Sequence, residues 1–534
     1  VHIIIQLIMI TTNKITVQFG KKPLFEDISI TFNKGNVYGL IGANGSGKST
    51  FMNVLSGDLE PSSGNVSVQK DHRISLLSQD QYAFEKCKII DCVMMGHKKL
   101  WDIKSERERI YSLESMTEEE GIKVAELEVE FADIDGYSAE SNAGELLVGL
   151  GIENDEHDMK MSEISPEKKL KVLLAQALFG DPDIMLFDEP TNNLDLDTIT
   201  WLEKTLKMRN SLMVIISHDR HFLNNVCTHM VDLDYGGLHL YSGNYDSFMV
   251  ESKLSRSLLI NENIKKEAKI KELESFVRRF SANASKAKQA TSRANQLKKI
   301  KLAEVKKSSR VYPFIKFNQE KKIYNSVLEV EGLKKHYDEL KVIQNFSLNV
   351  ENGERIAVIG KNGIGKTTLL ESLVQNIEID SGKINWNKNV SIGYFSQNHN
   401  MDFNQDITLI NWMKQWAQKD DDMQLIRGTL GRLLFSQDHI DKSIKVLSGG
   451  EKRRMIFGKI LLQRPNVIVM DEPTNHLDME TIESLNLGLS RFDGTLIFSS
   501  HDREFISSLA TRIIEIKDEG INDFTTGHDL LRVN

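Results

Sequence analysis

The chain of 534 residues has few cysteines, few prolines and no long hydrophobic run. Its three cysteines, Cys87, Cys92 and Cys227, are too few and too irregularly spaced for a disulfide scaffold or for a zinc or iron–sulfur site. No segment approaches the ~20 consecutive apolar residues that a membrane helix needs. The apolar start lacks the basic leader and the small-residue cleavage site of a signal peptide. We therefore expect a cytoplasmic protein with reduced thiols and a native start at Met9, with residues 1–8 an upstream over-extension of the reading frame.

Negative charge is only mildly in excess, and the balance changes along the chain. The net charge of −9 argues, taken alone, against a nucleic-acid-binding protein. Residues 253–322, however, contain 20 Lys and Arg against 6 Asp and Glu, a net of +14, which leaves −23 for the rest. Such a basic segment is the electrostatic footprint of a phosphate-binding surface, although a solvated helical spacer would carry the same charge. Residues 97–140 are the opposite, with 6 basic and 13 acidic residues, and Thr117 with Glu120 fits a capping box that begins a helix.

The two halves of the chain repeat one set of motifs at equal spacing. GANGSGKST at residues 42–50 and GKNGIGKTT at residues 360–368 both match G-x-x-x-x-G-K-[ST], and each follows a short apolar run typical of a buried strand. The loop lysine precedes a glutamine by 31 residues in both halves, and a DE pair precedes an SHD histidine by 30. One match would be moderately specific, whereas two in the same context indicate an internal duplication.

This duplication predicts an α/β fold with two tandem P-loop domains, at residues 9–250 and 326–534. The stretch between them, residues 251–325, is rich in Lys and Arg and has apolar residues at helical spacing, so we expect a basic helical hairpin as the linker. Only one interval between motifs differs, 86 residues against 51. The first half therefore has about 35 extra residues, which predicts a small helical arm inserted at about residues 94–142.

Each glycine-rich loop is suited to wrap a phosphate chain. Glycine lets backbone N–H groups close on an anion without a Cβ in the way, and the helix that follows adds its positive end. The lysine should reach the β- and γ-phosphates, and the adjoining hydroxyl should hold Mg²⁺. The expected nucleotide contacts are Gly42, Asn44, Gly45, Gly47, Lys48, Ser49 and Thr50 in the first half and Gly360, Asn362, Gly363, Gly365, Lys366, Thr367 and Thr368 in the second.

Carboxylates, histidines and glutamines complete each predicted site. In each half a DE pair ends an apolar strand, so that the aspartate can hold Mg²⁺ and the glutamate can orient and deprotonate the attacking water. The SHD histidine could contact the γ-phosphate, with a loop-capping role as the alternative. An aromatic residue 29 positions before the loop lysine could stack on adenine or simply pack in an edge strand. The predicted catalytic residues are Glu189, Glu472, His218 and His501, the Mg²⁺ ligands are Ser49, Gln79, Asp188, Thr367, Gln397 and Asp471, and the adenine contacts are Phe19 and Tyr337.

Together these motifs resemble the ATP-binding cassette. LSGGEKRR at residues 447–454 matches the signature sequence of such cassettes, and each DE pair continues as EPTN-x-LD. Two cassettes on one chain without a membrane segment, joined by the charged sequence FVRRFSANASKAKQATSR at residues 276–293, resemble the ABC-F family of ribosome-associated translation factors.

This resemblance implies that the two halves of a monomer pair head to tail and sandwich two ATP molecules. Each nucleotide would lie between the glycine-rich loop of one half and the signature sequence of the other. The expected partners across the first site are Ser448, Gly449 and Gly450, and those across the second are Ser165, Pro166 and Glu167. Because the second set has lost both glycines, we expect the second site to bind ATP but to hydrolyse it more slowly.

The same resemblance implies a ribosome-binding factor whose linker approaches tRNA and rRNA. Few aromatic residues lie among the basic ones, so we expect phosphate contacts rather than base stacking. The acidic arm should avoid RNA and prefer a basic ribosomal protein. The contact candidates on the linker are Arg278, Arg279, Lys286, Lys288 and Arg293. The alternative is the ATPase subunit of a membrane transporter; a DNA-repair or cluster-bearing recycling protein of this class would need cysteines that the chain lacks.

Overall fold

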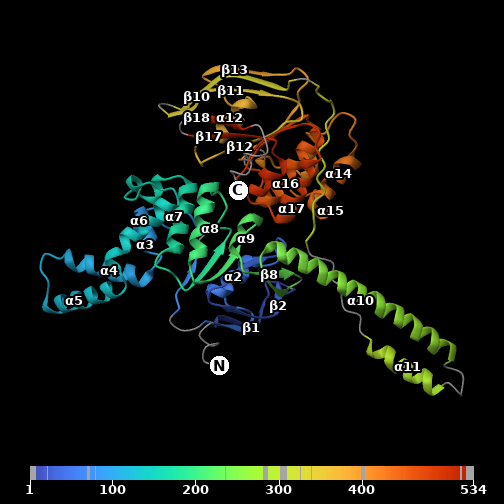
Figure 1. The fold of residues 1–534 in the computed structure, drawn as a ribbon, viewed down its shortest axis with the longest axis horizontal. Coiled ribbons are helices and arrows are strands. Elements are labelled where there is room, and N and C mark those ends of the chain that lie inside the picture. The colour runs from blue at the N-terminus through green and yellow to red at the C-terminus, as the bar shows by residue number, and fades with distance from the viewer. Residues whose placement is uncertain are drawn as a thin grey trace.

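The computed structural model describes residues 8–524, except residues 21, 69–71, 78–79, 235, 281–286, 301–309, 325, 338–339, 398–402 and 518–519. The chain forms two α/β units with a long helical linker between them and a helical arm on the first (Figure 1). The predicted pair of α/β units with a helical linker is thereby confirmed. None of the helices in this described part is both long and apolar enough to cross a membrane.

Each unit is built on a six-stranded sheet with the same strand order. The order is β5-β6-β7-β3-β8-β9 in the first unit and β14-β15-β16-β12-β17-β18 in the second, and only the last strand runs antiparallel. The central strands are buried along their whole length, because helices and the smaller sheets cover both faces. The strands of the first sheet are β3 (Val37–Ile41), β5 (Ile74–Leu76), β6 (Ile184–Asp188), β7 (Leu212–Ile216), β8 (His229–Asp234) and β9 (Gly237–Ser242). Those of the second are β12 (Arg355–Gly360), β14 (Ile392–Phe395), β15 (Val467–Asp471), β16 (Thr495–Ser499), β17 (Arg512–Lys517) and β18 (Gly520–Phe524).

A smaller antiparallel sheet of three strands accompanies each large sheet. Its order is β2-β1-β4 in the first unit and β11-β10-β13 in the second. Phe25 and Phe32 of β2 share a hydrophobic core with Leu40 of β3, so this core joins the two sheets. The strands are β1 (Ile8–Val17), β2 (Phe25–Asn33), β4 (Ser63–Val68), β10 (Leu328–Tyr337), β11 (Leu340–Val350) and β13 (Ser381–Trp386).

The helices begin where the sequence provides caps. Asp195, Asp219, Asp478 and Asp502 each accept a hydrogen bond from the backbone three residues on, which satisfies an otherwise unpaired N–H group. In the first unit the helices are α2 (Lys48–Ser56), α3 (Ile89–Met94), α6 (Ala139–Gly149), α7 (Pro166–Leu178), α8 (Leu196–Met208) and α9 (Arg220–Val226). In the second they are α12 (Lys366–Leu373), α13 (Leu409–Lys414), α14 (Met423–Arg432), α15 (Gln437–Ile440), α16 (Gly449–Gln463), α17 (Met479–Ser490) and α18 (Arg503–Leu509).

The arm consists of α4 (Lys98–Tyr111) and α5 (Glu118–Asp133), which extend from the first unit beside α3 and α6 (Figure 1). The predicted capping box is present at the start of α5, where the side chains of Thr117 and Glu120 bond reciprocally to each other's backbone. Arg107 of α4 holds the pair together, because its Nε lies 2.9 Å from Glu128 Oε1 of α5 and its guanidinium lies 3.9 Å from the Phe131 ring.

The linker consists of α10 (Tyr245–Phe280) and α11 (Ala287–Lys299), which pack along each other and extend away from both units (Figure 1). At 1.5 Å per residue, α10 is roughly 50 Å long. Its first turn belongs to the first unit, since Tyr245 and Phe248 lie in that unit's core. The linker helix therefore leaves the first α/β unit as a continuous extension of its core.

Candidate functional site

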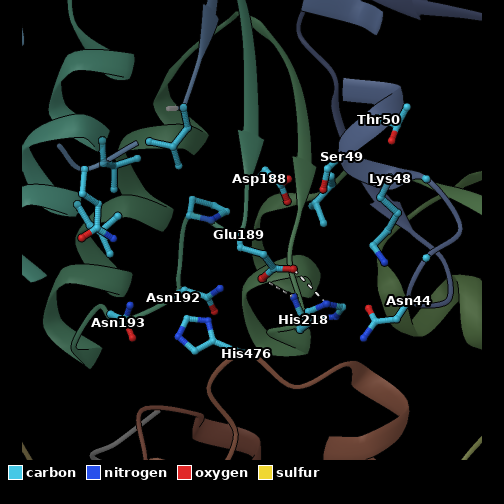
Figure 2. A pocket seen from close by; sticks show the side chains of 18 of the residues that line it. Asn44, Lys48, Ser49, Thr50, Asp188, Glu189, Asn192, Asn193, His218 and His476 are labelled. Carbon is cyan, nitrogen blue, oxygen red and sulfur yellow. Dashed lines mark hydrogen bonds and ion pairs between the residues drawn. The ribbon is translucent and has the colours of Figure 1, made fainter. Parts of the chain in front are cut away.

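The first candidate site is a cavity of about 710 Å³ around the loop at Lys48. Figure 2 shows that Asp188 and Glu189 face this loop and that His218 lies beside Glu189. His476, which belongs to the second unit, also lines the cavity. The cavity is therefore formed by both halves of the chain, and its size is in the usual range for a ligand site.

The glycine-rich loop holds Lys48 in position. Gly47 has a φ of 99°, in the left-handed region, and a Cβ there would lie 2.7 Å from the Leu24 side chain. Lys48 Nζ donates hydrogen bonds to the carbonyl oxygens of Gly42 (2.8 Å) and Ala43 (3.3 Å). Burial lowers the pKa of Lys48, and the charge of Glu189 opposes that shift. A buried ammonium at the start of α2 is suited to a phosphate, which would neutralise it.

Glu189 and His218 form a buried pair at the end of β6. Glu189 has a φ of 54°, a conformation that a non-glycine residue rarely adopts. Its Oε2 accepts a hydrogen bond from His218 N (3.2 Å), and its Oε1 lies 3.3 Å from His218 Nε2. Burial, and then the charge of Asp188, raises the pKa of Glu189 to about 8, while burial and Lys48 lower the pKa of His218 to about 4. Both side chains are thus mainly neutral near pH 7, and an ionised Glu189 would be a strong base for a water molecule.

The second candidate site repeats this geometry around Lys366 in a cavity of about 190 Å³. Lys366 Nζ donates to the carbonyl oxygens of Gly360 (2.9 Å) and Lys361 (3.0 Å). Glu472 has a φ of 46°, accepts a hydrogen bond from His501 N (3.2 Å) and lies 3.3 Å from His501 Nε2. Burial raises the pKa of Glu472 to about 8 and lowers that of His501 to about 3. The two sites are therefore alike in the residues that each half provides for its own loop.

Oxygen ligands suited to Mg²⁺ gather beside this second loop. Asp471 is fully buried at the end of β15, and its Oδ1 accepts a hydrogen bond from Ser499 Oγ (2.5 Å). Thr367 and Asp471 line the same cavity, and the Thr367 hydroxyl donates to Gln397 Oε1 (3.5 Å). A hydroxyl, a carboxylate and an amide oxygen are the hard ligands that Mg²⁺ takes beside phosphates, so these residues fit the ion. Ser49 and Asp188 lie together in the first cavity, whereas Gln79 is outside the described residues.

The two units contact each other directly between the sites. Asn44 of the first loop donates to Asp478 Oδ2 of the second unit (2.8 Å). Asn362 of the second loop donates to the carbonyl oxygen of Asn193 in the first unit (2.7 Å). Each glycine-rich loop is thus held by the EPTN-x-LD segment of the other half. The two halves therefore face each other within one chain, with each loop against the EPTN-x-LD segment of the other half.

The structure also shows where the remaining predicted residues lie. Phe19 lines the first cavity, 71% exposed, whereas Tyr337 lies outside the residues that line the second and has Lys335 beside its ring. Ser448 caps α16 through Glu451, and the lining of the first cavity includes none of Ser448, Gly449 and Gly450. Ser165 likewise caps α7, and Glu167 of that helix lines the second cavity in its place. The other loop residues named from the sequence line their cavities, except Gly42 and Gly360, which hold the lysines through their carbonyls.

Several lining residues were not among those named from the sequence, and two of them come from equivalent positions of the repeat. His476 lines the first cavity, and Asn193 lines both. They occupy the same position in TNHLD and TNNLD and share a positive φ, 55° and 61°. The only sequence signal for these two residues was that they occupy the variable position of the repeated motif. That position does not show that the side chain reaches the site of the other half, because the reach depends on how the two halves pack.

Comparisons with known proteins agree with this geometry. A family model described as ABC transporter matches residues 25–192 and 343–475, and a second model with the same description matches residues 231–317. The chain is 60% identical to "Probable ATP-binding protein YbiT" of Escherichia coli O157:H7 over 98% of both chains. It is 46% identical to "Uncharacterized ABC transporter ATP-binding protein YkpA" of Bacillus subtilis (strain 168) over 98% of this chain and 97% of that protein.

Solved structures share the fold at low sequence identity. The protein described as "RNase-L Inhibitor" has a TM-score of 0.62 at 17% identity, covering 96% of this chain and 90% of that one. A structure described as the complex of archaeal ribosomal stalk protein aP1 and archaeal ribosome recycling factor aABCE1 has a TM-score of 0.60 at 18% identity, covering 94% and 87%. These similarities show a common arrangement of two cassettes.

Proposed function

The chain belongs to the ABC-F family of tandem ATP-binding cassette ATPases, and we propose that it acts as an ATP-switched ribosome-binding translation factor. The observation that carries the proposal is the basic hairpin of α10 and α11, which extends away from two cassettes that face each other. A charged projection on an ATP-driven pair of domains is suited to reach RNA when the domains close. The ATPase subunit of a membrane transporter has no evident function for such a basic hairpin.

In this proposal each glycine-rich loop binds the phosphates of one ATP. Lys48 and Lys366 neutralise the β- and γ-phosphates, and Ser49 with Asp188, or Thr367 with Asp471 and Gln397, would hold Mg²⁺. Bound Mg²⁺ would offset the charge that develops on the transferred phosphoryl group. In their ionised form Glu189 and Glu472 orient and deprotonate water, and their neighbouring histidines hold each side chain in place through the contacts at 3.2 and 3.3 Å.

The hairpin offers cations where α10 ends. Arg278 and Arg279 are exposed on the last turn of α10, and Lys288 is exposed on α11. Arg293 is partly buried, with its guanidinium 3.7 Å from the Phe276 ring, so it also ties the two helices together. Lys286 lies outside the described residues. We therefore propose that Arg278, Arg279 and Lys288 bind phosphates and that Arg293 mainly supports the hairpin.

A trapping experiment tests the proposal. We expect the Glu189→Gln/Glu472→Gln variant, which should close on ATP without hydrolysing it, to sediment with 70S ribosomes in a sucrose gradient of cell lysate containing ATP. The wild-type chain in the same gradient is the control and should sediment mainly near the top. Recovery of the variant with membranes instead would favour the transporter alternative, and sedimentation as a free protein would refute ribosome binding.

Charge reversal at the hairpin should weaken this association. We expect Arg278→Glu/Arg279→Glu in the trapped variant to reduce ribosome binding about tenfold or more at physiological salt and to lower its salt dependence, because phosphate contacts release counterions. Binding at several salt concentrations measures both effects. The control is Lys204→Glu/Lys207→Glu, the same reversal at exposed positions of α8. Equal losses from both pairs would contradict a specific role of the hairpin.

We also propose that the acidic arm contacts a basic ribosomal protein rather than RNA. The exposed glutamates at the start of α5, Glu118 and Glu119, would repel a phosphate backbone. A photo-crosslinker placed at Tyr111, near the tip of the arm and exposed, should therefore label ribosomal protein in the trapped complex. Crosslinks predominantly to rRNA would overturn this assignment.

A further inference from the structure

The second cavity is lined by a carboxylate from the opposite half, whereas Glu480 and Asp478, the opposite-half carboxylates whose charges raise the pKa of Lys48, do not line the first cavity. Glu167 lines the cavity at Lys366, although it belongs to the first unit. It follows Pro166 at the start of α7, and its place in the repeat corresponds to Gly450, the second residue of the equivalent helix α16. Gly450 does not line the first cavity. The difference between the sites therefore lies in the residues that come from the opposite half.

Glu167 acts electrostatically on the phosphate-binding lysine. Its charge raises the pKa of Lys366, after larger contributions from Glu472, Asp471 and Asp195, against the lowering effect of burial, which is the largest of these effects. Glu167 is partly buried, so solvent screens this interaction incompletely. The carboxylate thus already supplies negative charge on the side of the cavity opposite the Lys366 loop. A third phosphate would enter this space last, because the loop holds the first two.

We propose that the second site prefers a nucleoside diphosphate to a triphosphate and that Glu167 sets this preference. This inference rests on nucleotide binding at both loops, as proposed above. A diphosphate neutralises the charge of Lys366 and brings no further negative charge close to Glu167. A triphosphate places an additional charge against a carboxylate, and Pro166 has no N–H group with which to bind it. The second cavity is also the smaller, 190 Å³ against 710 Å³.

The preference gives the second site a distinct part in the cycle. The first site, with an uncharged residue at the corresponding position, would bind and hydrolyse ATP. The second would bind ATP more weakly than ADP and would therefore exchange ADP for ATP less often. Glu167 is a specificity-determining residue in this scheme. A purely structural role is the competing explanation, because a glutamate in the first turn of α7 also favours that helix through its dipole.

Binding of two fluorescent nucleotides to the second site tests the proposal. In the full chain carrying Lys48→Ala, which disables the first loop, we expect Mg-ADP to bind at least tenfold tighter than Mg-β,γ-imido-ATP. Adding Glu167→Gln should reduce that ratio about tenfold by strengthening triphosphate binding, with the affinity for ADP changed less than twofold. Adding Lys366→Ala should abolish both signals, which assigns them to the second site.

The control removes a carboxylate elsewhere. Asp155→Asn, at an exposed position of the same unit, should leave the ratio unchanged. The proposal would be overturned if the Lys48→Ala parent bound both nucleotides equally or bound neither. It would also be overturned if Glu167→Gln changed the affinities for the two nucleotides equally. The last outcome would indicate a structural role, which a changed melting temperature would confirm. Loss of ribosome association in the gradient would refute the translation role and leave this ratio unaffected.

Discussion

Glu189→Gln is expected to reduce ATP turnover by the whole chain about 100-fold, whereas Glu472→Gln should reduce it only about two- to threefold. A general base typically contributes 10²- to 10⁴-fold, so the larger effect marks the site where most hydrolysis takes place. Steady-state phosphate release from each purified variant at saturating Mg-ATP measures both values. The substitution keeps the size of the side chain and the hydrogen bond from the histidine backbone, and it removes the ability to accept a proton.

The expected difference between Glu189→Gln and Glu472→Gln comes from residues that each site receives from the opposite α/β unit. Within its own half each glutamate is held in the same way, with a φ of 54° or 46° and its Oε1 3.3 Å from a histidine Nε2. Burial raises the pKa of both to about 8. Local geometry therefore predicts equal effects. Any difference must come from the opposite half, where Glu167 lines the second cavity and the residue at the matching position of the second half is Gly450.

Single-turnover hydrolysis separates the two sites. With one ATP equivalent bound per chain, Glu189→Gln should remove the fast phase and Glu472→Gln should leave it. Adding Glu167→Gly should make turnover more sensitive to Glu472→Gln, because it restores the residue type found at the matching position of the other half. Equal effects of the two glutamine variants on single-turnover hydrolysis would contradict the assignment of unequal sites.

Much of the fold was predictable from the sequence because the same motifs occur, at the same spacing, in both halves of the chain. Apolar strands ending in a carboxylate, as at Asp188 and Asp471, require burial on both faces, and the equal intervals between motifs imply equal strand orders. The capping box at Thr117 is equally local, since its geometry depends on four consecutive residues. In both cases the determining interactions lie within a single unit.

The features that were not predictable depend on how separate units pack. The signature residues around Ser448 were expected at the first site, yet the described cavity there is lined by His476 instead. Tyr337 carries the same spacing as Phe19 but does not line its cavity. Spacing along the chain fixes which side of a strand or helix a residue occupies. It does not fix the distance between two halves that are joined through a linker of about 75 residues.

One arginine where the linker returns to the cassettes joins both halves. Arg310 Nη2 lies 2.6 Å from Asp232 Oδ1 on β8, and its Nε lies 3.4 Å from Glu480 Oε1 on α17. Its guanidinium is also 5.4 Å from the Phe248 ring. Both carboxylates are at most 9% exposed, and burial raises the pKa of each while the charge of Arg310 opposes that shift. The arginine therefore favours the ionised form of two buried acids, one from each cassette.

Arg310→Met is expected to destabilise the chain by about 3–5 kcal/mol, because it leaves two buried carboxylates without their cation. Differential scanning calorimetry should show a lower melting temperature, with a larger loss at pH 8 than at pH 6. The direction of this pH dependence follows from proton linkage. Without the arginine, the pKa values of Asp232 and Glu480 in the folded state rise further above their values in the unfolded state. The folded state then binds more protons than the unfolded one, so its stability falls as the pH rises.

Two further variants distinguish charge from packing. Arg209→Met removes an arginine that is 14% exposed, close to the 15% of Arg310, but its partner Asp181 is 87% exposed, so we expect a loss below about 1 kcal/mol. Arg310→Met/Asp232→Asn/Glu480→Gln removes the buried charges together and should recover most of the lost stability and all of its additional pH dependence. If the triple variant stays as unstable as Arg310→Met, the arginine acts through its packing on Phe248, and the two cassettes are not held together by charge at this point.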